Sequence, residues 1–331
     1  MAAPSEPVAP APGADSAYAI FPKPQRATAD DGTPLAWTRL PAAAGSPRRR
    51  PVVTISGWSC SDAYWAHIAP ALTERGHDVV VLDARGHGAS GLPRPPGRNG
   101  TGLRADDISM ARLAGDVTAV MDAADVGDAV LMGHSMGVQI ALEVHRGHRD
   151  RVAGLALVAG SYENPLRTFF GVPVADALFP FAQLAVTATP APVTRLAMQP
   201  ARLTSFGAFA ARLARATGPR TRPEDLAPYL RHIAATDMAV MVRLIGSMRR
   251  HSAADHLRSI DVPTLILAAG RDTFTPPRCS NRMFERIPTA EIRWFDEAGH
   301  TLPIEEPDGI VEHFEEWYDR RVDGGGAPGP S

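Results

Sequence analysis

The amino-acid sequence predicts an α/β protein with a mostly parallel central sheet and helices on both of its faces. Short segments that are almost continuously apolar alternate along the chain with segments whose apolar residues recur at helical spacing. Strands that are apolar throughout are buried on both faces, as in parallel sheets covered by helices. The length of 331 residues suits one large domain with an insertion, or two smaller domains.

The alternation of apolar and helical segments begins near residue 35 and continues to about residue 320. Apolar runs predict strands at 35–40, 51–57, 78–83, 129–132, 152–159, 264–269 and 291–295. Helical spacing predicts helices at 62–75, 109–124, 138–145, 279–286 and 305–320. Strands and helices therefore follow one another along most of the chain.

The segment 161–256 interrupts this alternation. It has no clear strand, several helical patches and many prolines, and we expect it to be a helical lid inserted into a core made of residues 19–160 and 257–322. Its aromatic residues either pack the lid together or line a pocket for an apolar substrate. They are Phe169, Phe170, Phe179, Phe181, Phe206 and Phe209.

The composition is that of a globular protein with a sizeable core, because 44% of the residues are hydrophobic and 21% are charged. A formal net charge of −2 indicates neither a nucleic-acid partner nor an anionic membrane surface. No uninterrupted apolar stretch reaches the length of about 18 residues that a membrane span needs. We therefore expect a small-molecule substrate; the composition leaves the oligomeric state open.

Both ends of the chain, residues 1–18 and 323–331, are expected to be disordered tails. The first of them lacks the basic start and apolar centre of a signal peptide. The two cysteines, Cys60 and Cys279, are too few for a disulfide framework. These features favour a cytoplasmic protein.

The pentapeptide Gly133-His134-Ser135-Met136-Gly137 is the strongest sign of chemistry in the chain. It spells G-x-S-x-G and stands between a predicted strand and a predicted helix. This is the setting of a nucleophile elbow, in which a sharp turn lifts the serine hydroxyl above the edge of the sheet. The alternative is an ordinary glycine-rich turn.

A serine hydroxyl needs a base to take its proton, and the base needs an acid to hold its tautomer. Asp272 follows the predicted strand 264–269, and His300 follows the strand 291–295. The carboxyl ends of parallel strands meet at one edge of the sheet, where ligand sites form. We therefore predict a catalytic triad of Ser135, His300 and Asp272, with Glu163 as the reserve acid. Taken alone, an aspartate at the end of a strand is commonly a turn or a helix cap, and this is the alternative for Asp272.

Four segments together resemble the α/β-hydrolase superfamily, in particular its esterase-like and lipase-like serine hydrolases, over about residues 30–320. They are Ser56-Gly57-Trp58, the segment from Asp83 to Ser90, the pentapeptide around Ser135, and the loops of Asp272 and His300. The resemblance implies the α/β-hydrolase fold, with its helical lid inserted after the sixth strand.

The resemblance also implies an oxyanion hole made of the backbone N–H groups of Trp58 and Met136. Many relatives have His-Gly-X where this chain has Ser56-Gly57-Trp58, so the loop can be held differently here. The alternative for the Trp58 side chain is packing against the lid, and both roles are compatible. The segment Asp83 to Ser90 matches the pattern D-x-R-G-x-G-x-S, in which the glycines and the Asp–Arg pair shape a loop. His87 is accordingly expected to support that loop.

The remaining titratable residues match no metal or cofactor motif. The chain has no H-E-x-x-H, no P-loop, and no G-x-G-x-x-G at the start of a helix, so no metal and no cofactor is expected. His134 receives no catalytic role, because many residue types occupy its position. Cys60 lacks a histidine partner in the sequence and is interpreted as a small packing residue.

These observations predict a serine hydrolase that cleaves carboxylic esters with apolar acyl or alcohol groups through an acyl-enzyme on Ser135. An acyltransferase, a thioesterase or a cofactor-free perhydrolase could use the same triad, and a non-catalytic member of the fold could bind a small ligand there. Serine rather than aspartate at position 135 argues against epoxide hydrolases and haloalkane dehalogenases.

Overall fold

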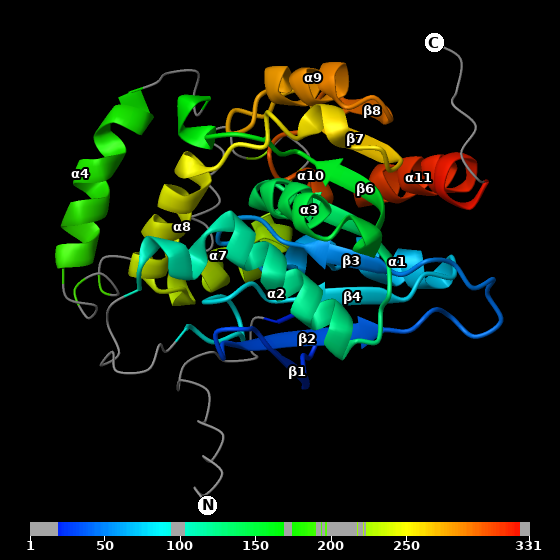
Figure 1. The fold of residues 1–331 in the computed structure, drawn as a ribbon, viewed down its shortest axis with the longest axis horizontal. Helices are drawn as coiled ribbons and strands as arrows, with labels where there is room; N and C mark the ends of the chain where they lie inside the picture. Colours follow the sequence, from blue (N-terminus) through cyan, green and yellow to red (C-terminus); the bar gives the residue numbers. More distant parts are fainter. Residues whose placement is uncertain are drawn as a thin grey trace, which may run out of the picture.

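The computed structural model describes residues 19–93, 103–168, 174–189 and 223–324, together with residues 193, 196, 217 and 221 (Figure 1). Its centre is an eight-stranded sheet in the order β1-β2-β4-β3-β5-β6-β7-β8. β2 pairs antiparallel with β1 and β4, and all the other neighbours are parallel. The predicted fold class is confirmed. The strands are β1 (Gln25–Thr28), β2 (Pro34–Leu40), β3 (Val52–Ile55), β4 (Val79–Leu82), β5 (Ala129–His134), β6 (Val152–Val158), β7 (Thr264–Ala269) and β8 (Ala290–Phe295).

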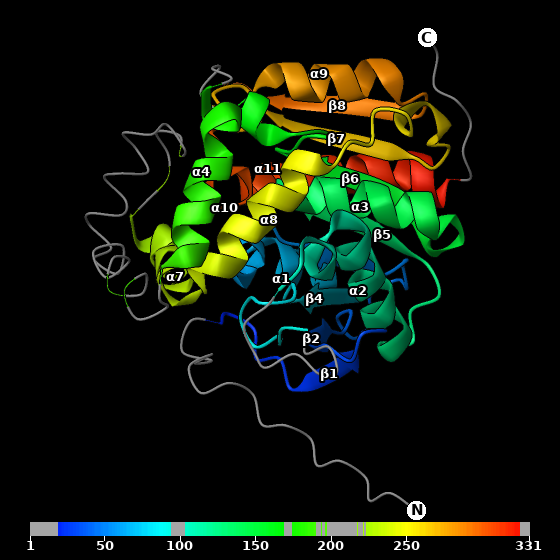
Figure 2. The same ribbon diagram turned by 60° about the vertical axis from the view of Figure 1, so that its left-hand side comes forward.

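Helices cover both faces of the sheet, as Figure 2 shows. α2, α3 and α9 contribute to one hydrophobic core, and α1 and α11 contribute to the other. The helices are α1 (Ile68–Glu74), α2 (Met110–Ala123), α3 (Met136–Gly147), α4 (Val174–Ala188), α7 (Pro223–Ala235), α8 (Met238–Arg250), α9 (Pro277–Arg286), α10 (Leu302–Glu305) and α11 (Pro307–Tyr318).

Alternation along the central strands explains why they are apolar throughout. In β5, Leu131 belongs to the core beneath α2 and α3, whereas its neighbours Val130 and Met132 belong to the core beneath α1 and α11. Successive side chains of a strand point to opposite faces, so a strand covered on both sides needs apolar residues at every position. Full burial of each such side chain contributes about 1.5–3 kcal/mol.

The first strand and the first helix differ from the sequence prediction, and α10 was not predicted. β1 was not expected, because it is a short edge strand in which only Ala27 is buried and no apolar run marks it. The single helix expected over 62–75 is divided into a 3-10 helix, Asp62–Trp65, and α1. Pro70 explains the division: it cannot donate a backbone hydrogen bond, and a helix that begins at Ile68 places it in the first turn, where no bond is required of it.

The segment inserted between β6 and β7 contributes α4, α7 and α8, which lie together at one end of the molecule in both views (Figures 1 and 2). Asp176 ties α4 to the rest of the insertion, because it accepts a hydrogen bond of 3.0 Å from Asn164 Nδ2 and pairs with Arg249 of α8. Phe179 is buried, whereas Phe181 is 72% exposed on the same helix. The other phenylalanines of the prediction, at 169, 170, 206 and 209, lie outside the described residues, as do residues 1–18 and 325–331 of the two predicted tails.

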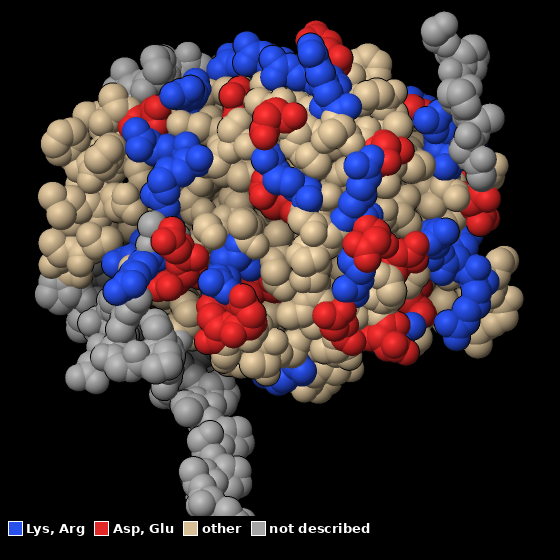
Figure 3. Space-filling view, in the orientation of Figure 1, with Lys and Arg blue, Asp and Glu red and all other residues tan. Residues whose placement is uncertain are grey.

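Charges of both signs are interspersed over the face shown in Figure 3, except for an uncharged area at the left, where α4 lies. This distribution agrees with the small net charge. Within the described parts of the chain, the helices are too short or too polar to cross a lipid bilayer.

Ser135 lies in a tight turn between β5 and α3, with φ 56° and ψ −114°. A non-glycine residue at positive φ is uncommon. The glycines on either side make the turn possible: a Cβ on Gly133 would lie 2.4 Å from the carbonyl oxygen of Gly137, and a Cβ on Gly137 would lie 2.1 Å from that of Ile55. The strand–turn–helix geometry predicted for the pentapeptide is therefore present.

In the segment Asp83 to Ser90, the side chains of Asp83 and Arg85 bind different partners and not each other. The buried guanidinium of Arg85 instead donates to Asp116 of α2, with Nε 2.6 Å from Oδ2, and to Asp31 at 2.7 Å. Asp83 accepts from the N–H of Ala89 at 2.9 Å and lies 3.3 Å from Lys23 Nζ. The two side chains point into different surroundings, and each shapes the loop through its own partners.

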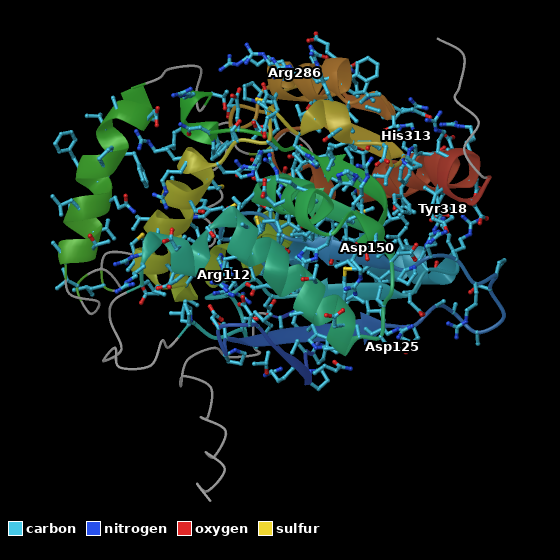
Figure 4. All side chains as sticks on the ribbon, viewed as in Figure 1. Arg112, Asp125, Asp150, Arg286, His313 and Tyr318 are labelled. Atoms are coloured by element: carbon cyan, nitrogen blue, oxygen red, sulfur yellow. The ribbon has the colours of Figure 1, made fainter. Side chains whose placement is uncertain are left out.

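Arg85→Ala is expected to lower the free energy of unfolding by about 3–5 kcal/mol, because it leaves the buried Asp116 carboxylate without its partner. Burial already raises the pKa of Asp116. Urea denaturation followed by circular dichroism measures the change. The matched control is Arg112→Ala, near the start of α2 (Figure 4). It removes an ion pair with the exposed Asp30 and is expected to cost less than about 1 kcal/mol. Equal losses in the two variants would contradict this interpretation of Arg85.

Gly137→Ala is expected to destabilise the fold by about 1–3 kcal/mol, because the new methyl group can fit only if α3 moves away from β3. Gly147→Ala, at the other end of the same helix, is the matched control, since a Cβ there meets nothing within 4 Å. We expect this control to be neutral or up to about 1 kcal/mol more stable. Thermal unfolding of both variants tests the difference, and the close approach at Gly137 is unimportant if they unfold alike.

Candidate active site

Three side chains from distant parts of the sequence form one hydrogen-bonded chain. His300 Nε2 lies 2.9 Å from Ser135 Oγ, and His300 Nδ1 lies 2.8 Å from Asp272 Oδ2. Ser135 follows β5, Asp272 follows β7, and His300 follows β8, so all three stand beyond the carboxyl ends of parallel strands. The residues that the sequence predicted to act together are therefore in contact.

The Asp272 carboxylate is almost completely buried and is held by its own loop. Its Oδ1 accepts from the backbone N–H groups of Phe274 at 2.7 Å and Thr275 at 2.9 Å. Its Oδ2 lies 2.8 Å from the Thr275 hydroxyl and faces His300. Asp272 thus accepts hydrogen bonds within its own turn, which was the alternative from the sequence, and it also contacts His300.

The surroundings of His300 determine its tautomer and its orientation. A carboxylate accepts hydrogen bonds, so Nδ1 carries the proton and Nε2 is left to accept one from the Ser135 hydroxyl. The ring of Phe274 stacks on the imidazole, with centroids 4.9 Å apart and an interplanar angle of 18°. The imidazole is thereby held between an aromatic ring and two polar partners.

His134 supports the His300 loop, a contact that the sequence did not reveal. Its Nε2 donates a hydrogen bond of 2.9 Å to the backbone carbonyl of His300, and the Tyr64 ring stacks on its imidazole at 4.7 Å. Burial lowers the pKa of His134 to about 3, so the ring is neutral and acts as a donor. No sequence signal at this position could have identified the contact, because the second position of G-x-S-x-G has no required residue type.

Glu163, the reserve acid, lies elsewhere. Its carboxylate is 3.5 Å from Arg282 of α9, and its backbone forms an isolated bridge with Ser252. The carboxylate in contact with His300 is that of Asp272.

Trp58 and Met136, the two predicted oxyanion donors, belong to segments that lie beside Ser135. Met136 is the first residue of α3, where backbone N–H groups have no partner within the helix and the helix dipole favours negative charge. Trp58 follows β3, and the preceding Gly57 approaches so closely that a Cβ there would lie 2.9 Å from Ser135 Cβ. Both segments can therefore contribute N–H groups next to the serine.

The Trp58 side chain packs against the inserted segment, which was the alternative considered for it from the sequence. Its indole Nε1–H donates a hydrogen bond of 2.8 Å to the carbonyl of Met241 in α8. Ser56, which stands where many relatives have histidine, accepts from the indole of Trp65 at 2.9 Å. The loop after β3 is thus held through the indoles of Trp58 and Trp65.

Cys60 does have a histidine neighbour, which the sequence pattern did not show. Its Sγ lies 3.9 Å from His134 Nδ1. Burial raises the pKa of Cys60 to about 12, so the side chain is a neutral thiol and not a nucleophile near neutral pH. A packing role agrees with these surroundings. Among the described residues, no three His, Cys, Asp or Glu side chains gather in a way that could hold a metal ion.

Comparison with known proteins identifies the family of this chain and several of its relatives. The family described as "Serine aminopeptidase, S33" matches residues 46–308. The protein named "Putative carbamate hydrolase RutD" of Caulobacter vibrioides is 28% identical over 267 residues, which are 80% of this chain and 88% of the relative. The protein of the same name from Klebsiella pneumoniae is 28% identical over 261 residues, or 78% of this chain and 87% of the relative.

Solved structures share the fold over most of the chain. A hydrolase from Pseudomonas aeruginosa superposes with a TM-score of 0.69 at 23% identity, covering 88% of this chain and 97% of that one. An enol-lactonase from Burkholderia xenovorans gives a TM-score of 0.69 at 19% identity, covering 89% and 100%. Together with the family match over residues 46–308, the fold shows that this chain is a hydrolase of the α/β-hydrolase superfamily and belongs to the serine aminopeptidase S33 family.

Proposed function

We propose that this chain is a serine hydrolase that cleaves carboxylic esters through an acyl-enzyme on Ser135. The observation that carries the proposal is the continuous hydrogen-bonded chain from Ser135 Oγ through His300 to Asp272. A nucleophile, a base and an orienting acid in this geometry are the arrangement that acyl transfer to a serine requires.

Each residue has a defined part in the proposed reaction. His300 Nε2 takes the proton of the Ser135 hydroxyl as the oxygen attacks the carbonyl carbon, and Asp272 stabilises the imidazolium that forms. The amides of Trp58 and Met136 bind the oxyanion, and loss of one such donor typically costs about 2.7–4 kcal/mol of transition-state stabilisation. His300 then gives its proton to the leaving alkoxide. Water, activated by the same imidazole, releases the acid from Ser135.

Carbamates are a second candidate substrate class, because the similarity to RutD extends over 80% of the chain. A carbamate offers Ser135 the same kind of carbonyl carbon, with nitrogen on one side and oxygen on the other. Acyl transfer, thioester hydrolysis and perhydrolysis would use the same first step and differ in what attacks the acyl-enzyme. The apolar character of the substrate remains a prediction from the composition of the inserted segment.

The wild-type protein is expected to hydrolyse short p-nitrophenyl esters and to be labelled by a fluorophosphonate probe at Ser135. Ser135→Ala should abolish both, since loss of the nucleophile costs about 10⁶ in kcat in a serine protease. Ser46→Ala, in the loop between β2 and β3, is the matched control and should behave as wild type. Peptide mass spectrometry locates the label, and a series of acyl chain lengths together with aryl carbamates ranks the substrates.

The outcomes of this experiment are distinct. A protein that neither hydrolyses any of these compounds nor reacts with the probe would rule out the proposed function. A protein that is labelled at Ser135 but hydrolyses nothing would replace it with acyl transfer or ligand binding.

Asp272→Asn is expected to reduce kcat by about 10⁴, because an amide can hold the histidine in the wrong tautomer, as in the well-studied serine-protease example. KM should change much less. Glu163→Gln is the matched control, since it changes the same chemical group at the reserve position. If Glu163→Gln proved to be the damaging change, the acid of the triad would be Glu163. Steady-state kinetics with p-nitrophenyl acetate separates the two results.

A further inference from the structure

The loop that carries Trp58 is closed by a four-residue turn, Gly57 to Cys60, in which the Cys60 N–H donates to the Gly57 carbonyl at 3.1 Å. Ser59 is the third residue of this turn and has φ 53°, in the left-handed region. A turn with positive φ at its third residue normally has glycine or asparagine there. Such a conformation persists only where the surroundings favour it over the alternative turn.

The imidazole of His87 provides that support. Its Nε2 accepts a hydrogen bond of 3.2 Å from the backbone N–H of Ser59, and its Nδ1 lies 3.2 Å from the carbonyl of Arg85. A neutral imidazole has one donor and one acceptor nitrogen, so these contacts require the proton to be on Nδ1. His87 is buried, and burial lowers its pKa, which keeps the ring in the neutral form that can accept.

The neighbouring groups preserve this state of the ring. On α7, the ring of His232 stacks on that of His87 with centroids 5.6 Å apart and an interplanar angle of 20°. Burial, the charge of His87 in its protonated form and the Lys23 ammonium lower the pKa of His232 to about 3, so it too is neutral. Tyr229, a second titratable side chain of α7, lies edge-on to Tyr64 and has its pKa raised by burial. His232 and Tyr229 therefore bring no charge to the His87 ring near neutral pH.

We propose that His87 is a positioning residue for the oxyanion hole: by accepting the Ser59 N–H, it selects the turn that holds the Trp58 amide beside Ser135. If the peptide between Trp58 and Ser59 rotated, Ser59 would leave the left-handed region and its N–H would leave His87 Nε2. The bond thus distinguishes the two forms of the turn. The Trp58 N–H belongs to the preceding peptide, so His87 acts on it indirectly, by fixing ψ of Trp58 and the path of the loop. The hydrogen bond from the Trp58 indole to Met241 holds the same loop from the side of the insertion. The inference rests on the proposed function, because it assumes that the Trp58 amide binds the oxyanion.

Two substitutions separate hydrogen bonding from packing at this position. His87→Phe keeps an aromatic ring against His232 but has no acceptor, and it should lower kcat for p-nitrophenyl acetate by about 5- to 30-fold, the effect of one or two kcal/mol. KM should change little, because the oxyanion develops only in the transition state. His87→Gln can offer its side-chain oxygen to the Ser59 N–H and should recover most of the loss. The matched control is His232→Phe, which keeps the stacked rings and leaves the acceptor in place.

The wild-type protein provides a second measurement that does not depend on the activity of a variant. With ¹⁵N-labelled histidine, the long-range ¹H–¹⁵N spectrum at neutral pH should show the His87 ring, identified by its absence in His87→Gln, as neutral with the proton on Nδ1. A ring protonated on Nε2 would overturn the inference. So would a folded His87→Phe variant with wild-type kcat, and in that case the proposed function would stand. If the wild type shows neither turnover nor labelling of Ser135, the proposed function fails and the inference falls with it.

Discussion

The approach of α3 to β3 at Gly137 is the constraint on which the rest of the site depends. The absence of a side chain there lets the first turn of α3 lie directly against the carbonyl of Ile55, the last residue of β3. This contact sets the distance between the turn that carries Ser135 and the loop that carries Trp58. A wider separation would increase the distance between Ser135 and the Trp58 amide, one of the two amides proposed to bind the oxyanion.

A second set of contacts connects the serine to the acid across the end of β6. The Ser135 N–H donates to Val158 at 3.1 Å, the Ala159 N–H donates to Leu267 of β7 at 2.9 Å, and the Thr275 hydroxyl lies 2.9 Å from the Ala159 carbonyl. The loop of Asp272 is thereby tied to the turn of Ser135 through the backbone of the strand between them. The hydrogen-bonded chain through His300 consequently joins loops that the sheet already holds together.

Much of this arrangement could be predicted from the sequence, because it depends on local patterns. Apolar runs marked the central strands, and the residues just beyond their carboxyl ends included Ser135, Asp272 and His300. Other features depend on partners far away in the chain and left no local signal. The edge strand β1 has no apolar run, the Arg85 guanidinium bonds to carboxylates 54 and 31 residues away, and His134 reaches a backbone carbonyl 166 residues away. The division of the helix at 62–75 did have a signal, Pro70, whose position in a first turn accounts for it.

The histidines around the site differ in burial, and their proposed roles differ accordingly. His300 is the one that contacts Ser135, and its side chain keeps 12% of its exposure, whereas His87, His134 and His232 are buried more deeply. Burial lowers the pKa of each of the three, so each remains a neutral ring near neutral pH. A second positive charge beside His300 would oppose the imidazolium that forms during the proposed reaction, and His134 is close enough, at 5.1 Å between ring centroids, for this to matter. The burial of these rings has an energetic consequence in acid. As pH falls below the ordinary histidine pKa of about 6.5, the unfolded chain binds protons that the buried rings of the folded protein do not bind. The free energy of unfolding therefore decreases. The same burial that lets these rings act as fixed donors and acceptors therefore restricts the protein to conditions in which they stay neutral.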